Sequence, residues 1–475
     1  QKQNIRILVL FFVVLLTNIT LIVGDESCPS LTQKGVFDRR SQQRQANHQL
    51  RYIHYNAEWL FYPQLAQQWN TTIRATTHLD SVASMLASLD GDIIDLAEVL
   101  DCRTLRALNH SMVLSHVLEN PSSSAQLSSH EAMLIVGKDT ATHQNVGVLT
   151  RLSPVSDPFR SEQRVNYPVE QSQCCVETSG GACSTMSGNK GVSKHMMTYF
   201  DLPVPSLSSS NSTGTRKVAL IIMHFLAHPN SPERCLQREA QATVIAQMIK
   251  ENAIDKGYEV IVAGDFNDYD RDIQDAAHSI PTSRVLDIVK SSADLVNVAQ
   301  LEVLKKTESK FHYSCWWDKN NNGIDDGADE HTSIDHVLVS RSLAKHITSV
   351  EYRVDLYQQS STPSFYYSDH WPIVVDFDFS PQKDDDLPSQ VPMASLIIGL
   401  VILALAIGVL VFSCRRSTIS ARKEHQGMSV LDREDAGDQT IRPLNLLQDD
   451  DDVVDLSSEQ DLDHFIETSN FNGAR

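Results

Sequence analysis

Short apolar runs recur along the central part of the chain, and polar or turn-forming residues separate them. Runs of strand length occupy residues 52–55, 93–96, 132–136, 146–149, 218–223, 260–263, 334–339 and 372–377. Residues 79–89 and 236–252 instead carry apolar side chains at helical spacing, as Ala240, Val244 and Met248 show. Strands mixed with helices over residues 51–379 predict one α/β domain, large enough for a two-sheet architecture.

Several polar stretches interrupt or flank this pattern. Residues 170–193 are rich in Cys, Gly and Ser, and residues 203–215 are rich in Ser, so both are expected to be surface loops. Residues 25–50 are polar and rich in Gln and Arg, which predicts a loose leader. Residues 380–390 have the composition of a stalk.

Two longer apolar runs predict membrane-related segments. Residues 7–23 follow a basic start and predict a signal peptide over residues 1–24, with an uncleaved anchor as the alternative. Residues 391–411 carry no charge and are long enough to cross a bilayer, and Arg415 and Arg416 follow them. The basic flank marks the cytoplasmic side. We therefore expect a transmembrane helix over residues 391–414, a buried core helix being the alternative, and a disordered acidic cytoplasmic tail over residues 415–475.

This topology is that of a single-pass type I protein of the plasma membrane or an endomembrane, with its domain extracellular or lumenal. Three sequons would then be glycan acceptors, at Asn70, Asn109 and Asn211. The outer cysteines are expected to form disulfides in an oxidising compartment, and their odd number leaves one over. They are Cys28, Cys102, Cys174, Cys175, Cys183, Cys235 and Cys315. Cys174, Cys175 and Cys183 lack the spacing of a zinc site and are expected to staple the long loop.

The chain is acidic, with a formal net charge of -20. Such a balance does not favour tight, sequence-independent binding to nucleic acid, which Lys and Arg drive by releasing counterions. It does not exclude hydrolysis of a polyanion, because a bound metal supplies local positive charge.

Many of the predicted strands end in polar side chains that a core does not require. Catalytic groups are usually mounted at such rims, and this many endings are hard to explain by packing alone. The residues concerned are Asn56, Glu98, His224, Asp265 with Asn267, Asp335, and Asp369 with His370.

Short motifs within this set resemble the endonuclease/exonuclease/phosphatase superfamily. Gly264-Asp265-Phe266-Asn267 resembles its GDFN signature, Ile334-Asp335-His336 its IDH segment and Ser368-Asp369-His370 its terminal SDH. Residues 145–151 resemble the family segment that ends in Ser/Thr-Arg. The resemblance covers residues 51–379 and implies a two-sheet α/β sandwich with helices on the outside.

The resemblance also implies a metal site. Asn56 and Glu98 would hold a divalent ion, Mg²⁺ or Mn²⁺, and Asp369 would be a further metal or orienting carboxylate. The metal would neutralise a phosphoryl oxygen and polarise phosphorus.

The remaining residues would be catalytic. Asp265 and Asn267 would place the attacking water and a phosphate oxygen. His370, held by Asp335, would move a proton, and His224 would act on a phosphate oxygen or the leaving group. Which histidine is the acid stays open.

The chain departs from the family pattern at two positions. Ala97 stands where the family usually has Gln before the metal-binding Glu, which removes a supporting contact. Leu100 stands where some deoxyribonucleases have Arg, which weakens a nuclease assignment. Lys190 and Lys194 are either phosphate contacts or ordinary loop lysines.

Residues 318–329 resemble a calcium loop, with Gly at the sixth position. The ligands would be Asp318, Asn320, Asn322, Asp326 and Asp329. Because the apolar residue comes one place early and the last ligand is Asp rather than Glu, a plain Asn/Asp/Gly turn is the alternative.

These observations predict a Mg²⁺-dependent phosphoester hydrolase, with Ca²⁺ as a second candidate ion. A nuclease or general phosphodiesterase is favoured slightly over a sphingomyelinase-like lipid phosphodiesterase or a phosphatase, so the substrate is nucleic acid or phospholipid. A catalytically inactive surface receptor or adhesion domain is the alternative of another class, and the retained site residues speak against it.

Overall fold

The computed structural model describes residues 27–28, 44, 48–61, 72–119, 130–174, 186–205, 213–229, 231–301, 312–322, 324–325, 327–356 and 368–380. The expected signal peptide, transmembrane helix and tail lie outside these residues. Among the described residues, no helix combines the length and apolar composition of a bilayer crossing.

The first large sheet has six strands, in the order β14–β15–β1–β2–β4–β3. Its strands are β1 (Gln49–Leu60), β2 (Ile93–Val99), β3 (Glu131–Leu134), β4 (Asn145–Thr150), β14 (Ile347–Tyr352) and β15 (Ile373–Asp378). β1 pairs in parallel with β2 and antiparallel with β15, so segments from both ends of the domain meet at the centre of the sheet.

The second large sheet has five strands, in the order β10–β13–β9–β8–β7. They are β7 (Lys194–Pro205), β8 (Thr213–His224), β9 (Glu259–Asp265), β10 (Leu295–Asn297) and β13 (Asp335–Ser340). Two small sheets pair β5 (Val165–Tyr167) with β6 (Gly188–Lys190), and β11 (Cys315–Trp316) with β12 (His331–Thr332).

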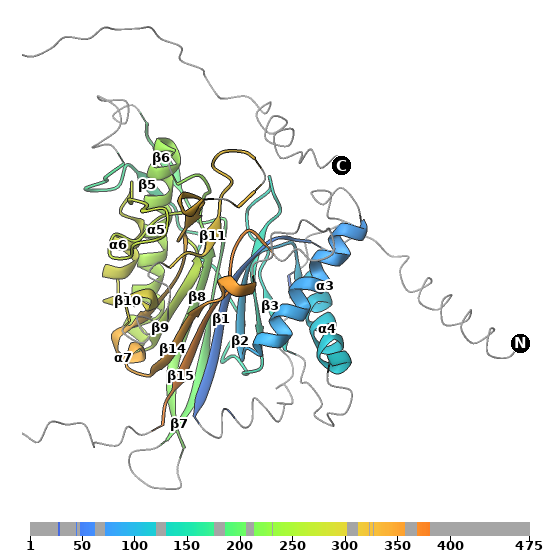
Figure 1. Cartoon of the computed structure of the whole chain (residues 1–475). Coiled ribbons are helices and arrows are strands. Elements are labelled where there is room, and N and C mark those ends of the chain that lie inside the picture. Colours follow the sequence, from blue (N-terminus) through green and yellow to red (C-terminus); the bar gives the residue numbers. More distant parts are fainter. Residues whose placement is uncertain are drawn as a thin grey trace, which may run out of the picture. The chain divides into compact units, whose positions relative to one another are not determined.

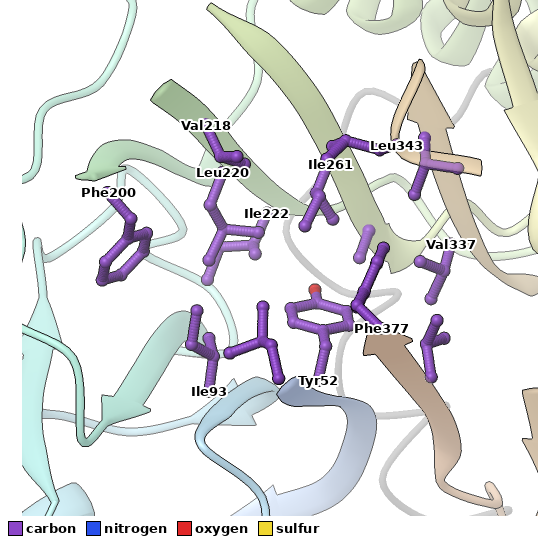
Figure 2. Packing of buried hydrophobic residues seen from close by; sticks show 14 of the residues in the cluster. Tyr52, Ile93, Phe200, Val218, Leu220, Ile222, Ile261, Val337, Leu343 and Phe377 are labelled. Carbon is purple, nitrogen blue, oxygen red and sulfur yellow. The ribbon is translucent and has the colours of Figure 1, made fainter. Parts of the chain in front are cut away.

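The two large sheets pack face to face. Tyr52 and Ile93 from the first sheet share one buried cluster with Leu220, Ile222 and Ile261 from the second, and Figure 2 shows these side chains turned toward one another. Each fully buried aliphatic side chain of this kind contributes about 1.5–3 kcal/mol relative to an exposed one. The packing therefore fixes the position of one sheet on the other.

Helices cover the outer face of each sheet (Figure 1). α3 (Thr72–Leu89) and α4 (Cys102–Glu119) share a buried cluster with the outer side chains of β1 and β2. α5 (Pro232–Asn252) and α6 (Val285–Ser291) do the same for β8 and β9. The described helices also include α7 (Arg341–Ala344) and the 3₁₀ turns η3 (Ile254–Lys256), η4 (Val298–Gln300), η6 (Ala328–Glu330) and η7 (Val354–Leu356).

The α/β class predicted from the sequence is confirmed, and each predicted run lies wholly or largely within a strand or helix. Among the strands of the two large sheets, β7, β10 and β14 were not predicted. The helices α4, α6 and α7 and the strands of the two small sheets were not predicted either. The expectation of a surface loop over residues 203–215 is wrong at its two ends, because Pro203–Pro205 extends β7 and pairs with the start of β8. Pro is tolerated there because β7 is an edge strand of its sheet.

Two disulfides tie distant segments to this framework. Cys28 bonds to Cys102 at the start of α4, and Cys174 bonds to Cys235 in α5. Cys174 therefore staples its loop to a helix rather than to another part of the loop. Cys315 is a buried free thiol, and Cys175 and Cys183 lie outside the described residues.

The segment before β1 is attached to the domain at a second point. Arg44 reaches Asp90 and Asp92 with ion pairs of 2.8 Å each. Together with the disulfide at Cys28, this contact places parts of the 25–50 stretch on the domain surface.

Candidate active site

The ends of β1 and β2 turn two polar side chains toward the space between the sheets. Strand alternation places Tyr52, His54 and Asn56 on the inner face of β1. On β2 the alternation is broken by a register shift around Glu98, whose φ is 62°. A bulge of this kind re-aims the side chain, and Asn56 Nδ2 lies 3.3 Å from Glu98 Oε1 as a result.

The ends of β8 and β9 bring a histidine and a carboxylate together. Gly264 has φ 154°, and a Cβ atom there would lie 1.9 Å from the Met223 carbonyl oxygen, so only Gly fits. This close approach holds the parallel register in which His224 stands opposite Asp265. His224 Nε2 consequently lies 3.6 Å from Asp265 Oδ2.

The turn after β9 adds Asn267. Its φ is 48°, a left-handed conformation that Asn adopts more readily than most residues. Its backbone N–H donates to Asp265 Oδ1 at 2.8 Å, and its Nδ2 donates to the Phe225 carbonyl at 3.3 Å. The Gly264–Asn267 motif thus positions Asp265 and joins the end of β9 to the loop after β8.

Asp335 and His370 form a carboxylate–imidazole pair between the sheets. His370 Nδ1 lies 2.6 Å from Asp335 Oδ2, and the Ser314 hydroxyl donates to the same oxygen at 2.8 Å. Burial alone would lower the pKa of His370, but the charges of Asp335 and Asp369 raise it well above its ordinary value. The imidazole ring is oriented with Nε2 toward Asn56, at 3.4 Å from Nδ2.

Asn56 links the two halves of the site. Its Nδ2 donates to Glu98 Oε1 at 3.3 Å and to Asp265 Oδ2 at 3.1 Å. Burial raises the pKa of Asp265 to about 8, with a further contribution from Asp335, and burial also raises the pKa of Glu98. The positive charge near Glu98 and Asp265 does not offset the cost of burying both carboxylates. The Asn56 amide lies between them, where a bound cation would neutralise both.

The donor set fits a divalent cation. Ligand atoms of Glu98, His224 and Asp265 lie within 4.8 Å of one another, and so do those of Asp265, Asp335 and His370. Carboxylate and amide oxygens are the ligands that Mg²⁺ prefers. Residues Asn56, Glu98 and Asp265 would hold such an ion.

A second group of contacts fixes Glu98 from its other side. Gln144 Nε2 donates to Glu98 Oε2 at 2.6 Å, and the Trp59 backbone N–H donates to the same oxygen at 3.0 Å. Lys194 Nζ in turn donates to Gln144 Oε1 at 3.1 Å. Lys194 therefore stands at the site, not in an open loop. Its charge offsets part of the rise that burial causes in the pKa of Glu98, and it adds to the lowering that burial causes in the pKa of His224.

The surroundings of His224 favour its neutral form. Burial, together with the charges of Lys194 and His370, lowers its pKa well below the ordinary value. The two histidines of the site are thus placed in opposite electrostatic environments.

Asp369 lies at the outer edge of this arrangement. Its Oδ1 is 3.7 Å from His370 Nε2, and its side chain is 34% exposed, far more than the other carboxylates of the site. Its ligand atom falls in a cluster with Cys315 and His370, and not in the cluster that contains Glu98. The geometry suits an orienting carboxylate better than a ligand shared with Glu98.

The loop over residues 318–329 stands apart from these groups. The oxygens of Asp318 and Asn320 both accept from the Asn322 backbone N–H at 3.0 Å, and Asp329 pairs with Lys319 at 2.8 Å. These are the contacts of a turn; Asp326 lies outside the described residues.

Of the expected glycan acceptors, Asn109 is described. It lies in α4, and its Nδ2 donates to the His130 carbonyl at 2.8 Å. Asn70 and Asn211 lie outside the described residues.

Sequence reasoning missed His54, Asp95, Gln144 and Ser314. His54 and Asp95 face each other across β1 and β2 and stand on the inner faces of both strands. The sequence could have indicated both residues, because a His or Asp inside an apolar run of strand length is unusual in a protein core. The position of Gln144 carries no such indication, because this residue precedes β4 and reaches Glu98 only in the folded sheet. It supplies the contact that the family pattern places at position 97.

Comparison with known proteins yields structural neighbours only. No family model and no curated protein matches the chain. The endonuclease/exonuclease/phosphatase of Bacteroides vulgatus matches 69% of this chain and 98% of its own, at 16% identity and a TM-score of 0.40. D. rerio TDP2 complexed with single strand DNA product matches 69% and 98%, at 17% identity and a TM-score of 0.38.

An endonuclease/exonuclease/phosphatase family protein of Bacteroides thetaiotaomicron matches 69% of this chain and 97% of its own, at 16% identity and a TM-score of 0.37. Two of these three neighbours are named as endonuclease/exonuclease/phosphatase proteins. Because all three TM-scores are below 0.5, the functional assignment rests on the geometry of the site itself.

Proposed function

We propose that the chain is a divalent-metal-dependent phosphoester hydrolase of the endonuclease/exonuclease/phosphatase type. One observation carries this proposal. The buried carboxylates of Glu98 and Asp265, bridged by Asn56, lie directly beside a histidine that a third carboxylate, Asp335, holds in place. A cation site next to an oriented imidazole is what metal-assisted hydrolysis requires.

Each half of the site has its own task. A bound Mg²⁺ or Mn²⁺ would neutralise charge on the phosphoryl group. Asp335 holds Nδ1 of His370, so proton transfer occurs at Nε2, which faces Asn56. Asn267 fixes Asp265 through its backbone N–H, and His224 and Lys194 supply hydrogen bonds and positive charge for phosphate oxygens. These assignments use residues from both sheets.

The inactive-receptor alternative has less support. An inactive domain is free to lose its metal ligands or its imidazole, whereas Glu98, Asp265 and His370 are all present and in contact with suitable partners. Unbalanced buried carboxylates are costly for a purely structural domain.

The cellular placement is part of the proposal. We place the domain outside the cytoplasm, on a single-pass type I protein anchored by residues 391–411. The disulfides Cys28–Cys102 and Cys174–Cys235 support an oxidising compartment.

The test is a substrate panel with the full chain, purified in detergent. Single-stranded and duplex DNA, RNA, sphingomyelin and a phosphoinositide are each incubated with Mg²⁺, with Mn²⁺ and with EDTA. We expect hydrolysis of at least one phosphoester, loss of it in EDTA, and loss of it in the folded His370→Ala variant. Hydrolysis that persists in EDTA contradicts the proposal. So does the absence of hydrolysis of every substrate by the wild-type chain.

A further inference from the structure

Behind the Asp335–His370 pair lies a buried chain of polar side chains. His54 Nε2 lies 3.1 Å from Asp335 Oδ1, on the side of the carboxylate away from His370. His54 Nδ1 contacts Asp95 Oδ1, and the Tyr52 hydroxyl contacts Asp95 Oδ2. The side chains of His54, Asp95 and Asp335 are all buried.

We propose that His54 is a positioning residue for the reaction, which sets the orientation of Asp335 and through it that of His370. The inference rests on the proposed function of the same site. His54 has no role in holding a metal or in touching substrate.

His54 and Asp95 stand at positions of β1 and β2 that face the space between the sheets. Their neighbours along the inner faces of β1 and β2, Tyr52, Ile93 and Ala97, pack into the apolar cluster between the sheets. An imidazole and a carboxyl group at such positions cost free energy unless each is hydrogen-bonded. A core built for stability alone is served by aliphatic residues there.

The two oxygens of the Asp335 carboxylate have different hydrogen-bond donors. Its Oδ2 accepts from Ser314 and from His370, whereas among the contacts the structure gives, His54 is the donor to Oδ1. Rotation about the Cβ–Cγ bond would move both oxygens of Asp335. The contact of His54 with Oδ1 therefore adds a third restraint, anchored in the opposite sheet, to the two donors on Oδ2.

The contact between His54 and Asp335 also has a direction. Oδ2 of Asp335 accepts from Ser314 and His370, and Oδ1 faces His54 Nε2 at 3.1 Å. Because a carboxylate only accepts hydrogen bonds, the hydrogen of this contact lies on Nε2 and His54 is the donor. Asp95 keeps the ring from turning.

The expected consequence is kinetic. When a supporting contact is lost, a displacement of the catalytic group by about 1 Å is enough to cost about 100-fold in rate. Substrate and metal binding involve other atoms, so KM changes little. A purely structural residue would affect stability without separating kcat from KM.

The test uses two nearly isosteric variants. In His54→Gln the amide nitrogen replaces Nε2 and can still donate to Asp335, whereas in His54→Asn the amide reaches only the position of Nδ1. We expect His54→Asn to lower kcat by about 100-fold with KM within about twofold of wild type, and His54→Gln to recover kcat to within about tenfold. Equal losses in the two variants, or a loss confined to KM, overturn the proposal.

A second measurement does not depend on activity. In the full chain with ¹⁵N-labelled histidine, His54→Asn should move the Nδ1 resonance of His370 by several ppm and His54→Gln should leave it near the wild-type value. If this resonance responds but the wild-type chain hydrolyses no phosphoester, the proposed function fails and the coupling stands. If hydrolysis is present and the resonance is the same in all three proteins, the coupling fails and the proposed function stands. Should His54→Asn not fold, Asp95→Asn, which frees the ring from the other side, takes its place with the same expected loss of kcat.

Discussion

Gln144 and Glu98 form a hydrogen bond of 2.6 Å in which the amide nitrogen donates to Oε2 of the carboxylate. The other oxygen, Oε1, faces Asn56 at 3.3 Å and His224 at 3.9 Å. One oxygen of Glu98 is thus held by the protein, and the other is presented to the site.

Replacing Glu98 tests its assignment as a metal ligand. Glu98→Gln removes the charge but keeps an oxygen donor, so the Mg²⁺ concentration for half-maximal activity should rise, and high Mg²⁺ should restore part of the rate. Gln144→Ala keeps the charge of Glu98 but removes the hydrogen bond that holds its carboxylate. Loss of such a supporting contact typically lowers metal affinity by about 10- to 100-fold. Magnesium titration of activity measures both. Wild-type metal dependence in Glu98→Gln would remove Glu98 from the metal site.

The Asp335–His370 pair predicts a loss that metal does not restore. Positioned acid–base catalysis contributes about 100- to 10,000-fold, so His370→Ala should lower kcat by at least that lower value at every Mg²⁺ concentration. Asp335→Asn should lower kcat as well, because an amide facing Nδ1 disturbs the tautomer and orientation of the ring. Circular dichroism confirms that each variant is folded. Near wild-type turnover in folded His370→Ala would show that this motif is not catalytic.

His130 predicts acid sensitivity of the fold. Burial, assisted by the charge of Arg151, lowers its pKa from 6.5 to about 3 in the folded protein. A histidine with a depressed pKa contributes stability fully above its unfolded pKa near 6.5, and that stability is lost as the pH falls toward 3. The loss approaches about 1.4 kcal/mol per pH unit within this window.

The measurement is urea unfolding between pH 7 and pH 4 for the wild type and for His130→Gln, which can still donate to the Gly91 carbonyl that His130 contacts at 2.9 Å. The difference between the two proteins isolates the histidine from the other titrating groups. As the pH falls, the free energy of unfolding should decrease more in the wild type than in His130→Gln. If the free energies of both proteins change with pH in parallel, the assigned pKa is wrong.

The disulfide Cys28–Cys102 predicts a dependence of stability on oxidation. It closes a loop with a sequence separation of 74 residues, and bonds of this kind typically contribute about 2–4 kcal/mol by restricting the unfolded chain. The double variant Cys28→Ser, Cys102→Ser should therefore unfold at lower urea, with Cys174–Cys235 left intact as the internal control. An unchanged urea midpoint would contradict the prediction.

The loop over residues 318–329 allows a direct test for calcium. If the loop binds Ca²⁺, the ion stabilises the folded state by mass action, and the thermal midpoint should rise with Ca²⁺ concentration. Asp318→Ala with Asn320→Ala should abolish that rise without changing the response to Mg²⁺. A calcium response that survives in the variant would identify the loop as an ordinary turn.

Apolar runs predicted the central strands well, because a strand that is buried on both faces of its sheet carries apolar side chains along its length. Residues 218–223 and 260–263 are examples. Three strands of the large sheets, β7, β10 and β14, were not predicted, and all three stand at the edge of their sheet. β7 also carries Pro203 and Pro205. The site residues Asn56, Asp265 and His370 were found because each stands next to an apolar run of strand length, although Asn56 lies inside β1, which continues to Leu60. The contact of Gln144 with Glu98 joins the segment before β4 to β2, and these two meet only in the folded sheet. Glu98 itself is aimed by a bulge that the sequence does not reveal.

The face-to-face packing of the sheets has a consequence for how this protein would tolerate change. Asn56 to Asp265, His54 to Asp335, and His370 to Asp335 are all contacts from one sheet to the other. A slip of one sheet by a single residue, about 3.3 Å, would break every one of them while leaving each sheet's own hydrogen bonds whole. The distances between the catalytic side chains therefore depend on how the two sheets are aligned. A small cavity between the sheets at a position farther from the site, such as Val218 on β8, should lower turnover before it unfolds the domain.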